Sequence, residues 1–222
     1  LRVVFDLEDG CPPAERKAGR ENVRRFGAPH DLYRVGEEAQ VDFDSVPAGG
    51  TIIIPKVEHP HFVGPKGIAV IETAIGLERV GEIAQRAGAL IIGLADLSTE
   101  LRSDAYNDYA RHRVLVAGRA AKKPVYDSPT GSLEPGSIIN HARSTYLMGF
   151  DGMAVLHPLE AKLAYEYAAP TRAELDRCRT ILDGVEDVHL NRGQMVGPPH
   201  VKRAKATLAR WANHPNARSP EG

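Results

Sequence analysis

The chain has 222 residues, of which 42% are hydrophobic and 26% are charged. This balance is typical of a soluble globular protein with one large domain and room for a small appendage. The 28 basic and 29 acidic residues nearly cancel, which argues against a nucleic-acid partner or an anionic membrane surface. No apolar run is long enough to span a bilayer, no secretory leader opens the chain, and the two cysteines lie far apart. We therefore expect a cytoplasmic protein.

Short apolar segments alternate with helical patterns along the first 158 residues. We expect strands over Leu1–Leu7, Leu32–Val35, Thr51–Val57, Gly67–Thr73, Ala89–Leu94, Pro124–Tyr126 and Asp151–Leu156. We expect helices over Pro12–Phe26, Ile75–Ala87, Ala105–Ala121 and Ile138–Met148. Strand–helix repeats indicate a parallel sheet, and strands that are apolar throughout indicate that both of its faces are covered. The pattern predicts an α/β fold with seven strands, one fewer than a (β/α)8 barrel needs.

The last third of the chain has a different pattern. Leu159–Tyr167, Arg172–Leu182 and Val201–Trp211 are predicted helices, with a loop-like stretch over residues 191–200. We therefore expect a barrel-type catalytic domain over residues 1–158 and a C-terminal helical extension over residues 159–212. Residues 213–222 are polar and lack periodicity, which is typical of a flexible tail.

Charged residues gather where the expected strands end. They are Asp6, Glu8, Asp9, Arg34, Lys56, Glu58, Glu72, Asp96, Asp127 and His157. In a barrel these strand ends form the active site, whereas a doubly wound sheet binds its ligand at a switch point. The chain contains neither GxGxxG nor GxxxxGK[ST], so nucleotide binding lacks its sequence motif.

Five phrases, taken in order, carry a resemblance to a known family. They are VVFDLEDG (Val3–Gly10), IPKVE (Ile54–Glu58), IETAIGL (Ile71–Leu77), GLADLSTEL (Gly93–Leu101) and FDGMAVLHP (Phe150–Pro158). They resemble the citrate lyase β-subunit-like (CitE-like) branch of the HpcH/HpaI aldolase family, and Gly193–Ala204 resembles the distal signature of that branch. The resemblance implies a TIM (β/α)8-type barrel with a C-terminal helical extension, assembled as a homotrimer or higher homo-oligomer.

The same resemblance implies an activity. It indicates a Mg²⁺-dependent carbon–carbon lyase that cleaves or forms a 3-hydroxyacyl thioester such as citryl-, citramalyl- or malyl-CoA. The products of cleavage are an acetyl-type thioester and a 2-oxo acid. Two alternatives stay open: an aldolase that acts on free 2-oxo acids, and a catalytically degenerate subunit that binds a metal and an acid ligand.

The chain departs from the family pattern in four places, of which the smallest is Arg34-Val35-Gly36, where the family often has an Asn at the third position. The family's first strand, a segment resembling LFVPGDRPERF, is absent from the sequence. Gly197 stands where the distal signature has an Asp, which the resemblance implies is an acid/base that reaches a neighbouring subunit's site. The segment between Glu58 and Gly67 is short for a barrel helix. Gly197 is the feature that favours the degenerate subunit.

Glu72 and Asp96 are the expected metal ligands, because each is expected at the end of an apolar strand. Mg²⁺ usually takes one or two protein carboxylates, and water and substrate oxygens complete its shell. The alternative is that the two carboxylates cap the helices that follow. The resemblance favours the metal role, and it adds a substrate contact for Glu72.

Arg34 is the expected substrate-binding and catalytic cation. A guanidinium offers a planar pair of donors to a carboxylate or a developing enolate, which Lys cannot copy. The alternative is a surface ion pair with Glu37 or Glu38. The position of Arg34 in the family pattern favours the substrate role.

The acids Asp6, Glu8 and Asp9 crowd one strand end. Like charges this close raise the pKa of at least one of them, which is common in active sites, although solvated acids in a turn would look the same. We expect Glu8 and Asp9 to line the site as catalytic residues and to hold a bound water or Arg34.

Two further residues have a supporting role in this interpretation. Lys56 stands where a Schiff-base lysine could stand, but the metal-dependent resemblance favours an ion pair with Glu58 or with a strand-end acid. We expect His157 to contact the residues that form the site without binding the metal itself. Cys11 and Cys178 are interpreted as ordinary thiols.

Overall fold

The structure is a computed structural model that describes residues 2–36, 38–183, 189–191, 194–212 and 214. The chain divides into two compact units. The first unit holds Leu1–Pro129 and Met148–Ala154, and the second holds Thr130–Leu147 and Val155–Gly222. The predicted tail, residues 213–222, lies outside the described residues except for residue 214.

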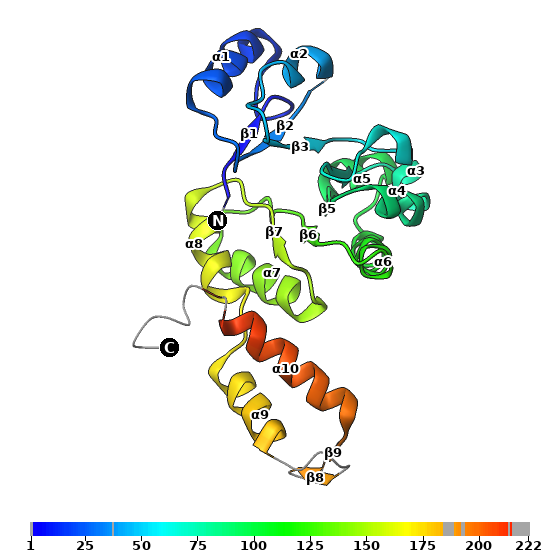
Figure 1. Ribbon diagram of the computed structural model, residues 1–222, viewed down its shortest axis with the longest axis vertical. Coiled ribbons are helices and arrows are strands. Elements are labelled where there is room, and N and C mark those ends of the chain that lie inside the picture. The colour runs from blue at the N-terminus through cyan, green and yellow to red at the C-terminus, as the bar shows by residue number, and fades with distance from the viewer. Residues whose placement is uncertain (1, 37, 184–188, 192–193, 213, 215–222) are drawn as a thin grey trace. The chain divides into compact units, whose positions relative to one another are not determined.

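The first unit is built on a seven-stranded parallel sheet (Figure 1). Its strands follow one another in the sheet in the same order as in the chain. Each strand therefore pairs with the next one along the sequence, and β1 and β7 form the two edges. They are β1 (Val4–Asp6), β2 (Leu32–Arg34), β3 (Thr51–Ile54), β4 (Ile68–Ile71), β5 (Ala89–Ile92), β6 (Val125–Asp127) and β7 (Gly152–Met153). The prediction of a parallel α/β sheet from seven segments is confirmed.

Strand β4 shows why these segments lack alternating polarity. Successive side chains of a strand point to opposite faces of the sheet. Ile68 and Val70 pack in one apolar cluster, whereas Ala69 and Ile71 pack in another. All four are buried, since both faces of the central strands are covered. An apolar residue is therefore stable at every position of the strand.

Helices cover the sheet in the first unit, and α4 and α6 pack against each other beside β5 and β6 (Figure 1). The connection from β3 to β4 holds one 3-10 turn, Pro60–Phe62, in place of a helix. The helices of this unit are α1 (Arg16–Phe26), α2 (Ala39–Phe43), α3 (Ala74–Glu78), α4 (Val80–Arg86), α5 (Leu94–Leu101) and α6 (Asn107–Ala120).

Two expectations about these elements were wrong. The predicted helix Ile75–Ala87 is two helices that meet at Arg79, and the first begins after Thr73, whose side chain accepts a hydrogen bond from Gly76 N–H at 3.0 Å. The predicted strand Ala89–Leu94 ends at Ile92, and the residues after Gly93 form helix α5. The connection after β5 therefore begins as a helix almost at once.

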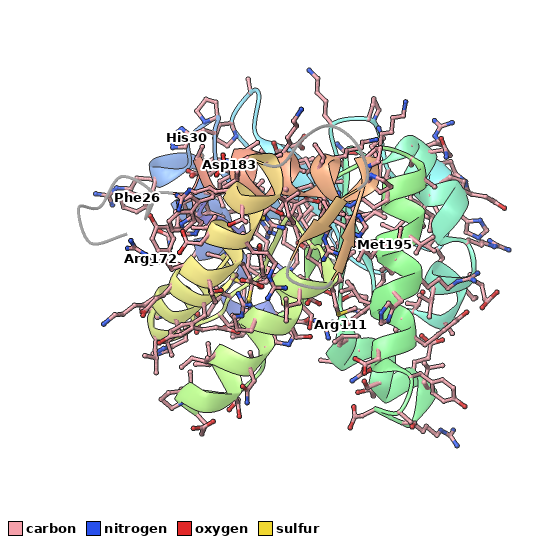
Figure 2. All side chains as sticks on the ribbon, turned by 90° about the horizontal axis from the view of Figure 1, so that it is seen from below. Phe26, His30, Arg111, Arg172, Asp183 and Met195 are labelled. Carbon is pink, nitrogen blue, oxygen red and sulfur yellow. The ribbon has the colours of Figure 1, made fainter. Side chains whose placement is uncertain are left out.

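The second unit is helical. It contains α7 (Pro135–Met148) up to Leu147, α8 (Pro158–Tyr167), α9 (Arg172–Asp183) and α10 (Pro198–Ala212). Helices α9 and α10 lie side by side (Figure 1), and Arg172 and Asp183 mark the two ends of α9 in Figure 2. The short strands β8 (His189–Asn191) and β9 (Gln194–Val196) pair antiparallel where we expected a loop. Within the described residues, no helix is both long and apolar enough to cross a membrane.

A buried carboxylate ties two loops of the second unit together. Glu160, on the first turn of α8, is 2% exposed. Its Oε1 accepts hydrogen bonds from Thr130 N–H at 2.7 Å and Thr130 Oγ1 at 3.0 Å, and its Oε2 accepts one from Leu156 N–H at 2.8 Å. The loop before α7 and the loop before α8 are therefore held at one point.

Candidate active site

Asp6 and Arg34 form the centre of a charged cluster at the carboxyl ends of the first strands. They are paired in the register of β1 and β2. Arg34 donates from Nε to Asp6 Oδ1 at 2.8 Å and from Nη2 to Asp6 Oδ2 at 2.5 Å, which is the two-point geometry of an arginine–carboxylate pair. Burial alone would raise the pKa of Asp6, but the hydrogen bonds from Arg34 and from the backbone lower it.

Asp6 also organises the turn that follows β1. It accepts hydrogen bonds from Glu8 N–H and Gly10 N–H, both at 3.0 Å. These bonds fold the chain back on itself directly after the strand, so the alternation of side chains stops at Asp6. The acids that follow are placed by this turn and not by the pleat of the strand.

Glu8 links two cations. It is 6% exposed, and its Oε1 lies 2.7 Å from Lys56 Nζ while its Oε2 lies 2.7 Å from Arg34 Nη1. The contact with Arg34 is an ion pair without hydrogen-bond alignment, because Glu8 Oε2 receives no hydrogen bond. Asp9 is 63% exposed and approaches Arg34 Nη1 only to 3.6 Å. Glu8 is therefore fixed by its partners, whereas Asp9 is free to meet solvent.

Glu72 follows directly after β4 and is buried, with 3% of its surface exposed. Its Oε1 accepts a hydrogen bond from Lys56 N–H at 2.7 Å. Burial raises the pKa of Glu72 to about 7, and the negative charges of Glu8 and Asp96 add to this effect. The three carboxylates thus share one region of the first unit and repel one another there.

Asp96 is not at a strand end, contrary to the prediction. Strand β5 ends at Ile92, and Asp96 lies on the first turn of helix α5, where a carboxylate faces the positive end of the helix. The capping alternative is also not what the structure shows. The residue that caps α5 is Gly93, and the residue that caps α3 is Thr73, so neither Glu72 nor Asp96 caps a helix.

Gly93 leaves the space that Glu72 needs. A β-carbon at this position would lie 2.6 Å from Glu72 Oε2 and 2.7 Å from Glu72 Cβ. The backbone φ of −106° is open to any residue, so close approach explains the glycine and conformation does not. The Oε2 atom of Glu72 therefore faces the start of α5, the helix that carries Asp96.

This donor set fits Mg²⁺ better than a transition metal. Among the described residues, no group of three or more His, Cys, Asp or Glu side chains could hold a metal ion. Structural zinc needs four such ligands, whereas Mg²⁺ keeps several waters and binds through one or two carboxylates. Two acids, one with an oxygen that lies beside Gly93, are enough for a cation whose other ligands are water and substrate oxygens.

The contacts of the described residues bear on the alternatives for Arg34 and Lys56. The pairing with Glu38 belongs to Arg20, at 2.9 Å, and not to Arg34, while Glu37 lies outside the described residues. Lys56 pairs with the strand-end acid Glu8, as one of the two expectations had it. Its pKa is raised, mainly by the hydrogen bond to Glu8, so the amine is held protonated and is a poor Schiff-base nucleophile.

Other strand-end residues have structural contacts. His157 is exposed, and its Nδ1 accepts a hydrogen bond from Leu159 N–H at 3.1 Å, so it caps α8. Asp127, at the end of β6, is buried and pairs with Arg111 of α6, Nη2 to Oδ2 at 2.6 Å. The sequence marks Asp127 as a strand-end acid but gives no sign that Arg111 is its partner. Gly197 precedes α10 and donates from its N–H to His200 Nδ1 at 3.2 Å.

The fold and the site together define a class: parallel α/β proteins with acids and an arginine at the carboxyl ends of the strands. No protein-family model matches the chain. The citrate lyase subunit beta of Leuconostoc mesenteroides subsp. cremoris is 26% identical over 93% of this chain and 84% of that protein. A (3S)-malyl-CoA thioesterase of Cereibacter sphaeroides is 26% identical over 94% of this chain and 85% of that protein.

A solved structure agrees with these relatives. CitE of Mycobacterium tuberculosis, in complex with magnesium, acetoacetate and coenzyme A, has a TM-score of 0.85 and 26% identity, covering 94% of this chain and 89% of that one. The resemblance to CitE-like proteins is confirmed: this chain is similar to citrate lyase β subunits and β-subunit-like proteins over more than nine tenths of its length. The alignment with the Leuconostoc protein spans 255 residues, more than the 222 of this chain, so the relative carries segments that this chain lacks.

Proposed function

We propose that this chain is a Mg²⁺-dependent carbon–carbon lyase that cleaves or forms a 3-hydroxyacyl thioester. Cleavage yields an acetyl-type thioester and a 2-oxo acid. The observation that carries this proposal is the cluster of Glu72 and Asp96 beside the Arg34–Glu8–Lys56 ion pairs. The magnesium and coenzyme A in the complex of the M. tuberculosis CitE support the cofactor and the thioester.

Glu72 and Asp96 hold the cation in this proposal, and Glu72 also faces the substrate. A bound cation of this kind supplies positive charge at the carboxylate and hydroxyl oxygens of the acid portion. It would also relieve the mutual repulsion of Glu72, Glu8 and Asp96 that raises the pKa of Glu72. The remaining tasks fall to the protein side chains.

Arg34 stabilises the negative charge that develops on the substrate in this proposal. When the hydroxyl loses its proton, the carbon–carbon bond breaks, its electron pair passes to the thioester fragment, and an enolate forms. Asp6 occupies Nε and Nη2 of Arg34 and fixes the plane of the guanidinium. Nη1 has an ion pair with Glu8 but no aligned hydrogen bond to it, so its N–H groups are the donors that can stabilise that enolate. The enolate then takes up one proton to give the acetyl-type thioester.

Glu8 and Asp9 complete the catalytic set with different roles. Glu8 is held between Arg34 and Lys56, so its charge keeps the two cations in place. Asp9 is exposed and lies 3.6 Å from Arg34, so it is the acid best able to pass a proton to or from water. This assignment gives the proton a carrier although Gly197 stands where the family has an acid.

A product assay tests the activity. Citryl-, citramalyl- and malyl-CoA are supplied with Mg²⁺, and the 2-oxo acid and the acetyl-type thioester are measured together. We expect Mg²⁺-dependent turnover for one of them and a loss of about 100-fold or more in Glu72→Gln, since a charge-stabilising group is removed. Glu82→Gln, which changes an exposed acid on α4, is the matched control. Full activity in Glu72→Gln would contradict the site.

The relative from Cereibacter sphaeroides favours a second candidate, hydrolysis of the thioester. The same assay separates the two reactions, because hydrolysis releases free CoA and leaves the hydroxy acid whole. Turnover of free 2-oxo acids without any thioester would favour an aldolase. Binding of Mg²⁺ and oxaloacetate without turnover, read as a rise in melting temperature, would favour a degenerate subunit.

We further propose the architecture that goes with this function. The seven strands are seven of the eight in a TIM-type barrel whose first strand lies outside these 222 residues. Residues 1–158 form the catalytic domain, residues 159–212 form the helical extension, and the protein works in the cytoplasm as a homotrimer or higher homo-oligomer. Its small-molecule partners are the 2-oxo acid and the acyl thioester.

A further inference from the structure

Lys56 has a left-handed backbone conformation, although it lies after a strand and not at the end of a helix. Its φ is 49°, in the left-handed region that residues with a β-carbon adopt uncommonly. Two other non-glycine residues among those described share this region, Arg102 and Lys122. Arg102 caps α5 and Lys122 follows the end of α6, where left-handed residues are ordinary. Lys56 follows a strand, so helix termination does not explain it.

The conformation turns the Lys56 amide out of the sheet ladder and toward a carboxylate. Pro55 has no N–H to donate, and Val57 N–H returns to the ladder by donating to Val70 O at 3.2 Å. Between them, Lys56 N–H donates to Glu72 Oε1 at 2.7 Å. Strained residues persist where the surroundings hold them in place, and such residues cluster at functional sites.

The side chain of the same residue reaches a second carboxylate. Lys56 Nζ lies 2.7 Å from Oε1 of the buried Glu8. Glu8 follows β1 and Glu72 follows β4, and β2 and β3 lie between these strands in the sheet. One residue therefore fixes two acids that belong to opposite sides of the cluster.

We propose that Lys56 is a positioning residue that orients Glu72 through its amide and Glu8 through its ammonium group. The left-handed backbone is the part that cation binding needs. This inference rests on the proposed function, in which Glu72 binds Mg²⁺. The Lys56 amide engages Oε1 of Glu72, and no described residue donates to Oε2, which lies beside Gly93. The amide thus selects which oxygen is presented to the cation.

Paired substitutions separate the backbone from the charge. Lys56→Gly keeps the N–H and adopts the left-handed region freely but loses the ammonium group. Lys56→Val loses the ammonium group and disfavours the left-handed backbone, since its β-carbon is branched. Lys56→Ala imposes a milder backbone cost and serves if the Val variant does not fold. Lys122→Gly and Lys122→Val repeat the comparison at a left-handed lysine outside the cluster.

Titration calorimetry with Mg²⁺ alone is the first readout, with melting temperatures as the measure of folding. We expect Lys56→Gly to bind Mg²⁺ within about threefold of the parent and Lys56→Val to bind at least tenfold more weakly than Lys56→Gly. The two Lys122 variants should bind alike. Equal Mg²⁺ affinity in the Gly, Ala and Val variants at position 56 would overturn the proposal. Loss of the ammonium group should lower kcat in Lys56→Gly while its Mg²⁺ affinity is kept.

Metal-free crystal structures keep the inference apart from the proposed function. If the parent protein binds no Mg²⁺, the proposed function fails, but the role of Lys56 is still decided by the position of Glu72. A Glu72 carboxylate that turns away in Lys56→Val and stays in Lys56→Gly supports the positioning role. A carboxylate that stays in place in both variants overturns it.

Discussion

At the scale of single residues, Asp6 accepts more hydrogen bonds than any other acid of the cluster among the described residues. It accepts two hydrogen bonds from Arg34 and two from the backbone of the turn that follows β1. The strand end and Arg34, the proposed catalytic cation, therefore depend on one carboxylate. Arg34 would still face Glu8 and Asp9 without it, but the plane of its guanidinium would no longer be set.

Replacing Asp6 with Asn tests this role through the pH dependence of stability. The pKa of Asp6 is lower in the folded chain than its ordinary value of 3.8, so the pairing stabilises the fold above that pH and is lost as the pH falls through the folded-state pKa. Asp6→Asn should lower the free energy of unfolding at pH 7 by about 1–3 kcal/mol, as expected for hydrogen bonds to a charged group. Urea unfolding of the parent and of Asp6→Asn, at pH 7 and below pH 3.8, measures this difference in the free energy of unfolding. A difference that is as large in acid as at pH 7 would contradict the role of Asp6.

The roles of these acids were only partly predictable. The phrase VVFDLEDG marks a buried strand with acids at its end, and Arg34 is recognisable as a strand-end cation. The expectation that Glu8 and Asp9 are the catalytic acids rested on the closeness of three acids in the sequence. Which acid pairs with Arg34 depends on a turn made by hydrogen bonds from Glu8 N–H and Gly10 N–H to Asp6, and such a turn leaves no periodic pattern.

At the scale of elements, the junction of β5 and α5 determines the geometry around Glu72. Strand and helix are separated only by Gly93. Because no loop intervenes, Asp96 comes within one helical turn of the strand end, and the backbone at Gly93 passes against the Glu72 carboxylate. The sequence predicted the strand but not the helix, since the residues of GLADLSTEL continue the apolar run past Ile92.

Gly93→Ala should disturb this junction. The added methyl group would lie 2.6 Å from Glu72 Oε2, so the carboxylate must shift, and we expect Mg²⁺ affinity to fall about tenfold or more while the fold is kept. Gly81→Ala in α4 is the matched control, because nothing lies within 4 Å of a β-carbon there. That control should raise helix stability by about 0.5–1 kcal/mol. Equal Mg²⁺ affinity in the two variants, measured by calorimetry, would show that Glu72 tolerates a neighbour at position 93.

A second junction joins a helix to the sheet through charge. Arg111 of α6 and Asp127 of β6 are both buried and paired at 2.6 Å. Asp127→Leu alone should cost about 3–5 kcal/mol, because it leaves a buried cation without its main partner. The double variant Arg111→Met with Asp127→Leu should recover most of that loss, since a buried pair can be replaced by apolar side chains at little cost. Thermal unfolding of the three proteins tests both statements.

At the scale of the whole chain, the order of strands was predictable and the division into units was not. Seven apolar segments separated by helical ones allow a parallel sheet with neighbours in chain order, and that is the sheet observed. The compact units instead cut through helix α7 and place residues 130–147 with the helical part of the chain. Only tertiary packing separates these residues from the helices that precede them, and no composition change marks the boundary.

Gly197 allows a test that concerns the assembled protein. It precedes α10, so Gly197→Asp places a carboxylate at a helix N-terminus and should stabilise the helix by about 0.3–1 kcal/mol. If the protein assembles as proposed, that carboxylate also reaches a neighbouring subunit's site, and a positioned acid there should raise turnover about tenfold or more. The two effects are separable, because melting temperature reports the helix and turnover reports the site.

Mixing subunits decides whether the acid acts across an interface. A subunit that carries both Gly197→Asp and Glu72→Gln lacks the proposed carboxylate ligand at position 72 but still presents the new carboxylate. Added to the parent protein under conditions that exchange subunits, it should raise turnover above that of the parent alone, since it can serve only a neighbour's site. A mixture that only dilutes the parent's activity, while Gly197→Asp alone is more active, would place the acid in its own subunit's site. A stabilised helix without any gain in turnover would instead leave Asp9 as the group that carries the proton.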